Sequence, residues 1–266
     1  MRKHWVLTAV MCLAITSLAS ADFTAYNDCI PGSVNVEGGN NPANTTTIGR
    51  NQTGVLKDFA TGVDTTVSVE FVVSGMKATD GTGAVDNFTT GNDAANMFNG
   101  KVNMAGSVIY YEQADWYADL IFTGLDSSKQ YVLAATHDRG TEKGYWNRWS
   151  VYTIQGTDAA TYTGTVAPVG DSTTLVNLSN ESVSIVASNT ASGNLAQWTD
   201  IDPGDDGTFN LHVTYARDDT EWGSGGQTGL KAYAPGGFML QEVPEPATMS
   251  LLAIGALALI RRRRKV

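Results

Sequence analysis

The sequence predicts an all-β protein, built as a single jelly-roll-like β-sandwich with an N-terminal signal peptide and a short C-terminal apolar helix on either side. Three observations support this prediction. Apolar and polar side chains alternate with a period of two in several central segments, as in half-buried strands. Clusters of Gly, Asn, Asp and Ser separate those segments, as turns do. The middle of the chain has about 220 residues, a comfortable size for one sandwich.

The strand signals follow one another along the chain. In the first, Val67, Val69 and Phe71 alternate with more polar neighbours. Further strands are expected over residues 117–123, 131–136, 149–154, 183–187 and 209–215. A single helical turn is expected over residues 93–98. No repeat of fixed period is present, which argues against a propeller or a β-helix. An immunoglobulin-like sandwich remains an open alternative to the jelly roll, because the pattern does not give the strand order.

Composition divides the chain into four parts. Residues 1–21 are expected to be a signal peptide, and residues 22–223 the β-sandwich domain. Residues 224–242 are Gly-rich and are expected to form a linker. Residues 243–266 form a separate C-terminal signal. Within the domain, the stretch 35–53 is rich in Asn, Gly and Thr and is expected to be a loop.

The N-terminus has the three parts of a secretory signal peptide. Arg2 and Lys3 form its positive region, and an apolar stretch follows. Ala19 and Ala21 supply the small residues that signal peptidase requires just before a mature end at Asp22. The sequence therefore predicts export through the secretion machinery, with an uncleaved membrane anchor as the alternative.

The C-terminus has a second tripartite order. The triplet Pro244, Glu245 and Pro246 comes first, and an uncharged apolar run over residues 247–260 follows. The chain then ends in a basic cluster, which contains Arg261, Arg262, Arg263, Arg264 and Lys265. As a helix the 14-residue run would be about 21 Å long, short for a hydrocarbon core of about 30 Å. The positive-inside rule places the basic cluster in the cytoplasm and the domain on the other side of the membrane.

This order resembles the PEP-CTERM sorting signal of Gram-negative bacteria. The resemblance implies that a membrane-embedded exosortase cuts near the triplet 244–246. It also implies transient anchoring in the inner membrane, followed by transfer to the cell surface or the extracellular matrix of a species that makes extracellular polysaccharide. An ordinary tail anchor is the alternative.

Charge limits the partners of the mature domain. Residues 22–243 hold 26 acidic and 10 basic residues, a net charge of −16. A nucleic-acid-binding surface needs clustered Lys and Arg, so a nucleic-acid partner is not expected. After the signal peptide, Cys29 is the only cysteine and His137 and His212 are the only histidines. A Cys/His zinc site is therefore not expected, and no cofactor is predicted apart from a structural calcium ion.

The segment 137–149 holds the groups that a sugar site uses: flat rings for stacking, with carboxylates, a guanidinium and an amide for hydroxyls. The candidate ligand-binding residues are Trp146, Trp149, Asp138, Arg139, Glu142 and Asn147. The domain also resembles secreted, galactose-binding-like carbohydrate-binding sandwiches in its general pattern. Trp149 shares a strand face with Val151, and the alternative is that its ring lies in the core.

Two other functions remain open. An extracellular polysaccharide hydrolase would need two carboxylates about 5–9 Å apart. The candidates for that role are Glu112, Asp115, Asp119 and Glu142. A purely structural matrix protein would have no ligand. The leading hypothesis is a non-enzymatic, exosortase-processed surface protein that binds extracellular polysaccharide.

A weaker signal concerns calcium. Asp200, Asp202 and Asp205 supply hard oxygen ligands in a short turn, which suits calcium. The spacing is not that of an EF-hand loop, because Gly204 stands at a ligand position. An Asp–Gly turn before the strand at residue 209 explains most of the pattern.

Overall fold

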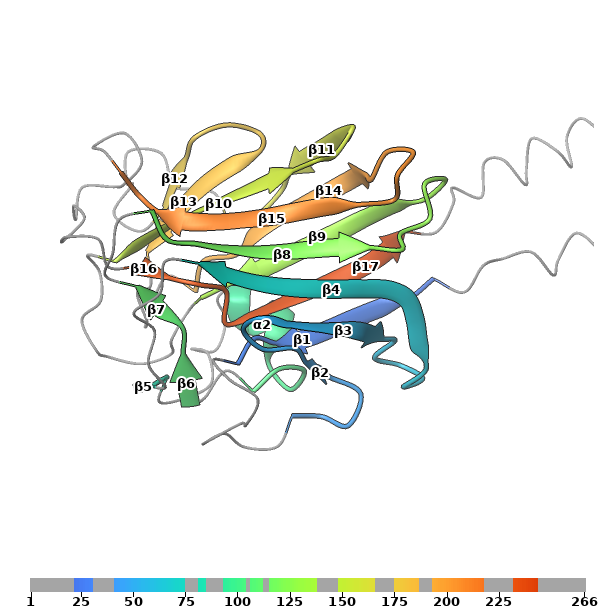
Figure 1. The fold of residues 1–266 in the computed structure, drawn as a ribbon, viewed down its shortest axis with the longest axis horizontal. Coiled ribbons are helices and arrows are strands. Elements are labelled where there is room, and N and C mark those ends of the chain that lie inside the picture. Colours follow the sequence, from blue (N-terminus) through green and yellow to red (C-terminus); the bar gives the residue numbers. More distant parts are fainter. Residues whose placement is uncertain are drawn as a thin grey trace, which may run out of the picture.

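The described part of the chain is a two-sheet β-sandwich with one short helix on its outside (Figure 1). The computed structural model describes residues 22–30, 41–74, 81–84, 93–103, 106–111, 115–137, 148–165, 175–186, 193–217 and 232–243. The signal peptide, the segment 138–147 and the C-terminal signal from residue 244 onward lie outside the described residues.

Sheet A has six strands and sheet B has seven. In spatial order, sheet A contains β11 (Ala159–Tyr162), β14 (Ala196–Asp202), β9 (Gln130–Thr136), β17 (Gly237–Val243), β1 (Thr24–Asp28) and β2 (Thr46–Thr47). Sheet B contains β12 (Leu175–Asn177), β13 (Ser182–Val186), β10 (Trp149–Gln155), β15 (Phe209–Tyr215), β8 (Tyr117–Thr123), β4 (Asp64–Ser74) and β3 (Gln52–Lys57). Within the two sheets neighbouring strands are antiparallel, except that β1 and β2 are parallel.

Two small two-stranded sheets accompany the sandwich. The pairs are β7 (Tyr110–Tyr111) with β16 (Ala232–Tyr233), and β5 (Gly81–Ala84) with β6 (Gly106–Val108). Helix α2 (Asp93–Phe98) is the one helix of the described part of the chain.

The main core lies between the two sheets, as the period of two requires. Val67, Val69 and Phe71 of β4 are fully buried, while the residues between them face outward. Phe122 stacks on Phe209 with ring centroids 4.7 Å apart. Burial of large apolar side chains of this kind supplies most of the stabilisation of the fold.

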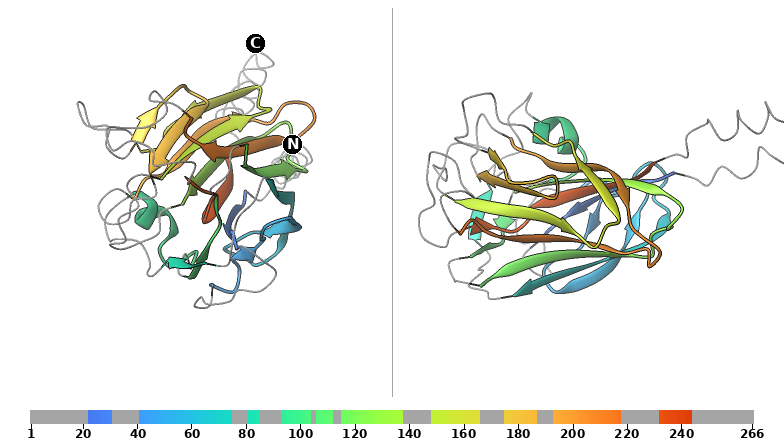
Figure 2. Two further views of the ribbon diagram at one scale, coloured as in Figure 1. Left: turned by 60° about the vertical axis from the view of Figure 1, so that its left-hand side comes forward. Right: turned by 90° about the horizontal axis from the view of Figure 1, so that it is seen from above.

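A second, smaller core lies on the outer face of sheet A, where α2 packs (Figure 2). Ala94 and Phe98 of the helix are fully buried against Tyr26 of β1 and Met239 of β17. The rings of Tyr26 and Phe98 meet edge to face, 6.3 Å apart. Sheet A is therefore covered on both faces where the helix lies.

The edge strand β11 is blocked by one side chain. The Oδ1 atom of Asn180, in the turn between β12 and β13, accepts a hydrogen bond of 3.0 Å from the backbone N–H of Tyr162. Its Nδ2 atom donates to the carbonyl oxygen of Ala160. These backbone groups would otherwise offer a template for another strand. Asn180 thus protects the edge and links sheet B to sheet A.

The two ends of the sandwich differ. One end, here called the turn end, holds the turns 58–63, 124–129, 156–158, 178–181 and 203–208. Thr24 pairs with Gln241, and Val243 pairs with Gln130 next to the turn 124–129. The described N-terminal and C-terminal strands therefore begin and end at the turn end, which lies at the right in Figure 1. The opposite end is called the loop end.

The structure confirms the all-β sandwich and most of the expected elements. Strands occupy each of the ranges expected from the alternating pattern, and the helical turn over 93–98 is α2. Two expectations are wrong. The expected loop 35–53 contains β2 and the start of β3, and the expected linker 224–242 contains β16 and most of β17. The predicted apolar C-terminal helix lies outside the described residues. Within the part that the structure describes, no helix is long and apolar enough to cross a membrane.

Candidate functional site

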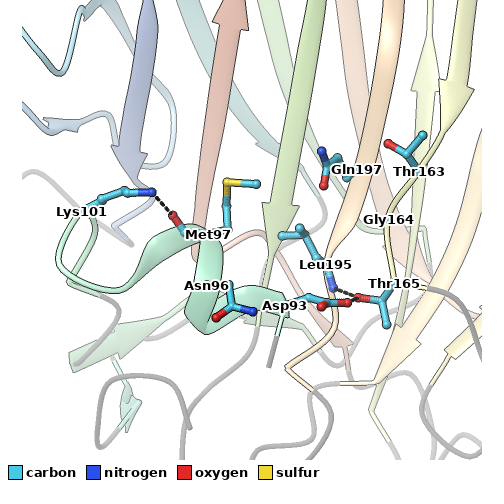
Figure 3. A pocket seen from close by; sticks show the side chains of 9 residues that line it. All are labelled: Asp93, Asn96, Met97, Lys101, Thr163, Gly164, Thr165, Leu195 and Gln197. Carbon is cyan, nitrogen blue, oxygen red and sulfur yellow. Dashed lines mark hydrogen bonds between the residues drawn. The ribbon is translucent and has the colours of Figure 1, made fainter. Parts of the chain in front are cut away.

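An open groove of about 420 Å³ lies beside helix α2, on the outer face of sheet A (Figure 3). One wall comes from the helix and the residues after it, and the other from β14 and the segment that continues β11. The lining residues are Asp93, Asn96, Met97, Lys101, Thr163, Gly164, Thr165, Leu195 and Gln197. A volume of this size is typical of small-molecule sites in proteins.

The helix wall is set by the pattern of the helix itself. Ala94, Ala95 and Phe98 are buried against the sheet, which leaves Asn96 exposed and Met97 half-buried at the groove. After the helix ends, the Nζ atom of Lys101 donates a hydrogen bond of 3.0 Å to the carbonyl oxygen of Met97. The helix therefore presents an amide and a thioether to the groove.

The sheet wall depends on a close approach of two backbones. The N–H groups of Thr163 and Gly164 donate to the carbonyl oxygen of Gln197 over 2.9 and 3.1 Å. A Cβ atom on Gly164 would lie 2.3 Å from the carbonyl oxygen of Leu195, far inside van der Waals contact. Only glycine allows this approach, and it sets the width of the groove on that side.

A hydroxyl joins the two walls. The Oγ1 atom of Thr165 accepts a hydrogen bond of 2.9 Å from the backbone N–H of Leu195. The same hydroxyl donates to the Oδ2 atom of Asp93 over 2.7 Å. A hydrogen bond to a carboxylate is stronger than a neutral one, so this relay holds the helix start against the sheet (Figure 3).

The lining suits an uncharged polar ligand. Asp93 and Lys101 carry one charge each, of opposite sign, and the ammonium group of Lys101 lies 5.0 Å from the centre of the Tyr26 ring. Asn96 and Gln197 add two amides, which both donate and accept hydrogen bonds. Met97 and Leu195 provide an apolar floor. Hydroxyl groups with an apolar C–H face match this combination.

Of the predicted sugar site, the structure describes one residue. Trp146, Asp138, Arg139, Glu142 and Asn147 lie outside the described residues. Trp149 is fully buried and packs with Val151 and Val186. The shared face with Val151 is as predicted, but the ring is not at the surface. Trp149 is therefore a packing residue, which corrects the expectation that it stacks on a sugar.

Both ends of the predicted loop 137–149 are held by aromatic contacts. The Nδ1 atom of His137, after β9, lies 2.8 Å from the hydroxyl oxygen of Tyr152 in β10, with the two rings stacked. The guanidinium group of Arg148 lies over the ring of Tyr233, and the two side chains are hydrogen-bonded. The Oγ atom of Ser150 donates to the carbonyl oxygen of Tyr233 over 2.8 Å. Tyr233 had no signal in the sequence, because it lies in the Gly-rich stretch expected to be a linker.

Cys29, the one cysteine of residues 22–266, lies in the main core. Cys29 is buried and forms no disulfide, and burial raises the pKa of its thiol well above the usual range. The thiolate, which is the reactive form, is therefore suppressed at neutral pH.

Two of the four candidate hydrolytic carboxylates, those of Asp115 and Asp119, lie among the described residues. Asp115 is exposed, with a φ of 63°. The Oδ1 atom of Asp119 lies 2.7 Å from the Nδ1 atom of His212 and accepts a hydrogen bond from Asn210. Glu112 and Glu142 lie outside the described residues.

In the candidate calcium turn, the carboxylates of Asp200 and Asp202 take part in local hydrogen bonds. The carboxylate of Asp202 accepts from the N–H of Gly204 over 3.0 Å, and that of Asp200 lies 3.2 Å from the hydroxyl of Thr199. Asp205 is exposed. Across the described ranges, no group of three or more Asp, Glu, His or Cys residues is placed to hold a metal ion. The structure therefore shows no ligand set that brings Asp200, Asp202 and Asp205 together.

The described domain ends where the C-terminal signal begins. Residues 242–265 match the family model of the PEP-CTERM protein-sorting motif. The match begins at Glu242, inside β17, and covers the triplet and the basic cluster. The chain has no match among curated proteins or among solved structures.

Proposed function

Because the chain carries a PEP-CTERM sorting motif and is therefore an exosortase-processed secreted protein, we propose that its β-sandwich is a non-enzymatic domain that binds a neutral polysaccharide outside the cell. The groove beside α2 is the proposed binding site. The final location is the cell surface or the extracellular matrix, where such a polymer is present.

The observation that carries the proposal is the lining of the groove. Hydrogen-bonding groups from Asn96, Gln197 and Thr163 stand around a floor formed by Met97 and Leu195. A sugar ring presents hydroxyls at its edge and C–H groups on its faces. Each hydroxyl can pair with an amide or hydroxyl at the rim, while the ring lies on the floor.

Charge selects the class of polysaccharide. The acidic and the basic group of the groove balance one another. The domain as a whole is strongly acidic, with a net charge of −16 over residues 22–243. Such a field repels polyanions, so a neutral chain is favoured over an acidic one.

The described acids favour a binding role over hydrolysis. Asp119 lies on the outer face of sheet B and is hydrogen-bonded to His212 and Asn210. Among the described residues that line the groove, Asp93 alone has a carboxylate, and its Oδ2 atom accepts from Thr165. Glycoside hydrolysis uses two carboxylates that flank the scissile bond.

The test is a screen of the mature protein against neutral and acidic glycans, with calcium present and again with a chelator. Asn96→Ala removes an exposed rim amide, and Asn99→Ala is its matched control, because Asn99 is exposed but does not line the groove. Loss of one hydrogen bond worth about 1–1.5 kcal/mol should weaken binding about 5- to 13-fold in Asn96→Ala.

The control should bind as the native protein does. Absence of binding by a folded protein would refute the proposal and favour a structural matrix role. Turnover of a glycan would instead favour the hydrolase. Binding that requires calcium would reveal an ion site that the described residues do not show.

A further inference from the structure

The sorting motif begins inside an interior strand of sheet A. Strand β17 is hydrogen-bonded to β1 on one side and to β9 on the other. Leu240, near its middle, pairs with Ala25 and with Leu133. Phe238 and Leu240 are fully buried in the main core. The chain is therefore fixed in the sandwich until it reaches the motif.

The last turn-end residues are also fixed. The backbone N–H of Glu242 donates to the carbonyl oxygen of Phe23 over 3.0 Å. The hydroxyl of Tyr131 donates to the Oε2 atom of Glu242 over 3.5 Å and accepts from the backbone N–H of Asp126 over 2.8 Å. Val243 pairs with Gln130. Strand β17 is therefore paired as far as Val243, and the turn 124–129 lies next to its end.

The length of chain after β17 limits how far the domain can stand from the membrane. Three residues, 244–246, separate Val243 from the apolar run that begins at Ala247. Fully extended, the four steps from Val243 to Ala247 span at most about 14 Å. Thr24, at the start of β1, pairs with Gln241. The chain therefore enters the sandwich at the turn end as well, shortly after the predicted signal peptide.

The turns at this end are acidic. They hold one basic residue, Lys129, against the acidic residues Asp58, Asp126, Asp158, Glu181, Asp205 and Asp206. Hydrogen bonds from Thr61 lower the pKa of Asp58, and hydrogen bonds from Ser128 lower that of Asp126, so both stay charged. An acidic end is repelled by anionic lipid. A protein is therefore favoured over the lipid surface as the neighbour of this end.

We propose that the turn end of the sandwich is the surface that the precursor presents to exosortase, and that β17 sets the minimum length of the mature protein. The enzyme works on a triplet that lies within about 14 Å of Val243. Because β17 is paired with β1 as far as Gln241 and with β9 as far as Val243, the chain up to Val243 is protected, and the mature C-terminus lies at Val243 or later. Leu195, which lines the groove, directly precedes the loop-end start of β14, so this part of the groove lies at the opposite end of that strand from the turns. The proposal rests on the sorting motif and is independent of glycan binding.

Photo-crosslinking in cells that express the full precursor and exosortase tests the contact. A benzophenone side chain replaces Ser127, which is exposed in the turn 124–129, and, as the matched control, Asn99, which is exposed after α2. The expected result is an exosortase adduct from position 127 that exceeds that from position 99 at least tenfold. Equal adducts, adducts to lipid alone or no adduct from position 127 would overturn the proposal.

Two further measurements test the limit that chain length sets on the distance between the domain and exosortase, and the protection of β17 from cleavage. A 12-residue Gly-Ser insertion between Val243 and Pro244 releases the domain from the 14 Å limit, so the adduct from position 127 should fall several-fold. An unchanged adduct would show that chain length does not hold the turn end near the enzyme. Mass spectrometry of the secreted protein should place its C-terminus at Val243 or later. A C-terminus within residues 237–242 would show that β17 is opened during processing.

Discussion

Gly164→Ala is the most direct perturbation of the groove. In the native protein Gly164 has no left-handed φ, so alanine fits its backbone conformation. The obstacle is steric. The new Cβ atom would lie 2.3 Å from the carbonyl oxygen of Leu195 and 2.7 Å from the backbone nitrogen of Gln197. Both are backbone atoms, so the clash cannot be relieved by a rotamer change, and the two strands must separate by about 1 Å.

The loss of stability in Gly164→Ala follows from the backbone hydrogen bonds of residues 163–165. Thr163 and Gly164 donate backbone hydrogen bonds to Gln197 of β14, and Thr165 donates one to Leu195 just before it, with lengths of 2.9–3.1 Å. Each contributes about 1 kcal/mol net, so their weakening should cost about 3 kcal/mol of the free energy of unfolding. For a domain of this size that corresponds to a fall in Tm of about 6–12 °C. The groove should also widen, and glycan affinity should fall with it.

The assay is urea unfolding of the mature protein, with Gly100→Ala as control. Gly100 has a φ of 72° and open space around its Cβ position. Alanine there should cost about 1 kcal/mol through backbone strain alone. A Gly164→Ala variant within 0.5 kcal/mol of the native protein would refute the close approach of β11 and β14.

Three further predictions concern the fold, each measured by urea unfolding. Asn180→Ala removes two hydrogen bonds to the edge strand β11 and should lower the free energy of unfolding by about 1–2 kcal/mol. The control, Asn99→Ala, should leave it unchanged. An unchanged urea midpoint in Asn180→Ala would show that these hydrogen bonds do not stabilise the edge strand. Burial raises the pKa of Asp28 to about 6, against a hydrogen bond from Asn41 that lowers it. Since the unfolded value is about 4, stability should fall as pH rises from about 4 to about 6 and then level off, and Asp28→Asn should remove this slope and stabilise the protein by at most about 3 kcal/mol at pH 7. A slope that persists in Asp28→Asn would assign it to another group. Trp149→Ala should lower the free energy of unfolding by about 3–5 kcal/mol, because the ring is fully buried. A loss below 1 kcal/mol would show that the ring is not buried.

Alternation predicts strands well where one face of a sheet is open to water. Strand β4 is such a case, because Val67 and Val69 face the core while Ser68 faces outward. Strand β17 is the opposite case. Phe238 and Leu240 enter the main core, and Met239, between them, packs under α2. With both faces covered, the apolar run has no alternation, and the glycines before it suggested a linker.

Strand β14 shows a second way in which the pattern is lost. Its pairing with β9 shifts register between Trp198 and Ile201, and Asp200 has a φ of 53°. The bulge breaks the period of two, so the strand carried no clear signal. Its neighbouring aspartates suggested a calcium turn instead.

The groove itself could not be predicted from local sequence. Its walls come from residues 93–101, 163–165 and 195–197, which are brought together only by the packing of α2 on sheet A. None of these segments carries a motif. The sorting motif, by contrast, is read from consecutive residues and needs no fold, which is why the sequence alone predicts it.

The central claim, that the groove binds a neutral polysaccharide, is tested most directly by NMR spectroscopy of the mature protein during titration with a glycan that binds in the screen. The side-chain amide groups of Asn96 and Gln197 give their own signals, as does that of Asn99 outside the groove. The signals of Asn96 and Gln197 should shift together, with one dissociation constant, while the signal of Asn99 stays in place. Shifts confined to residues 137–149, with the groove amides unchanged, would contradict the claim and place the ligand on the loop.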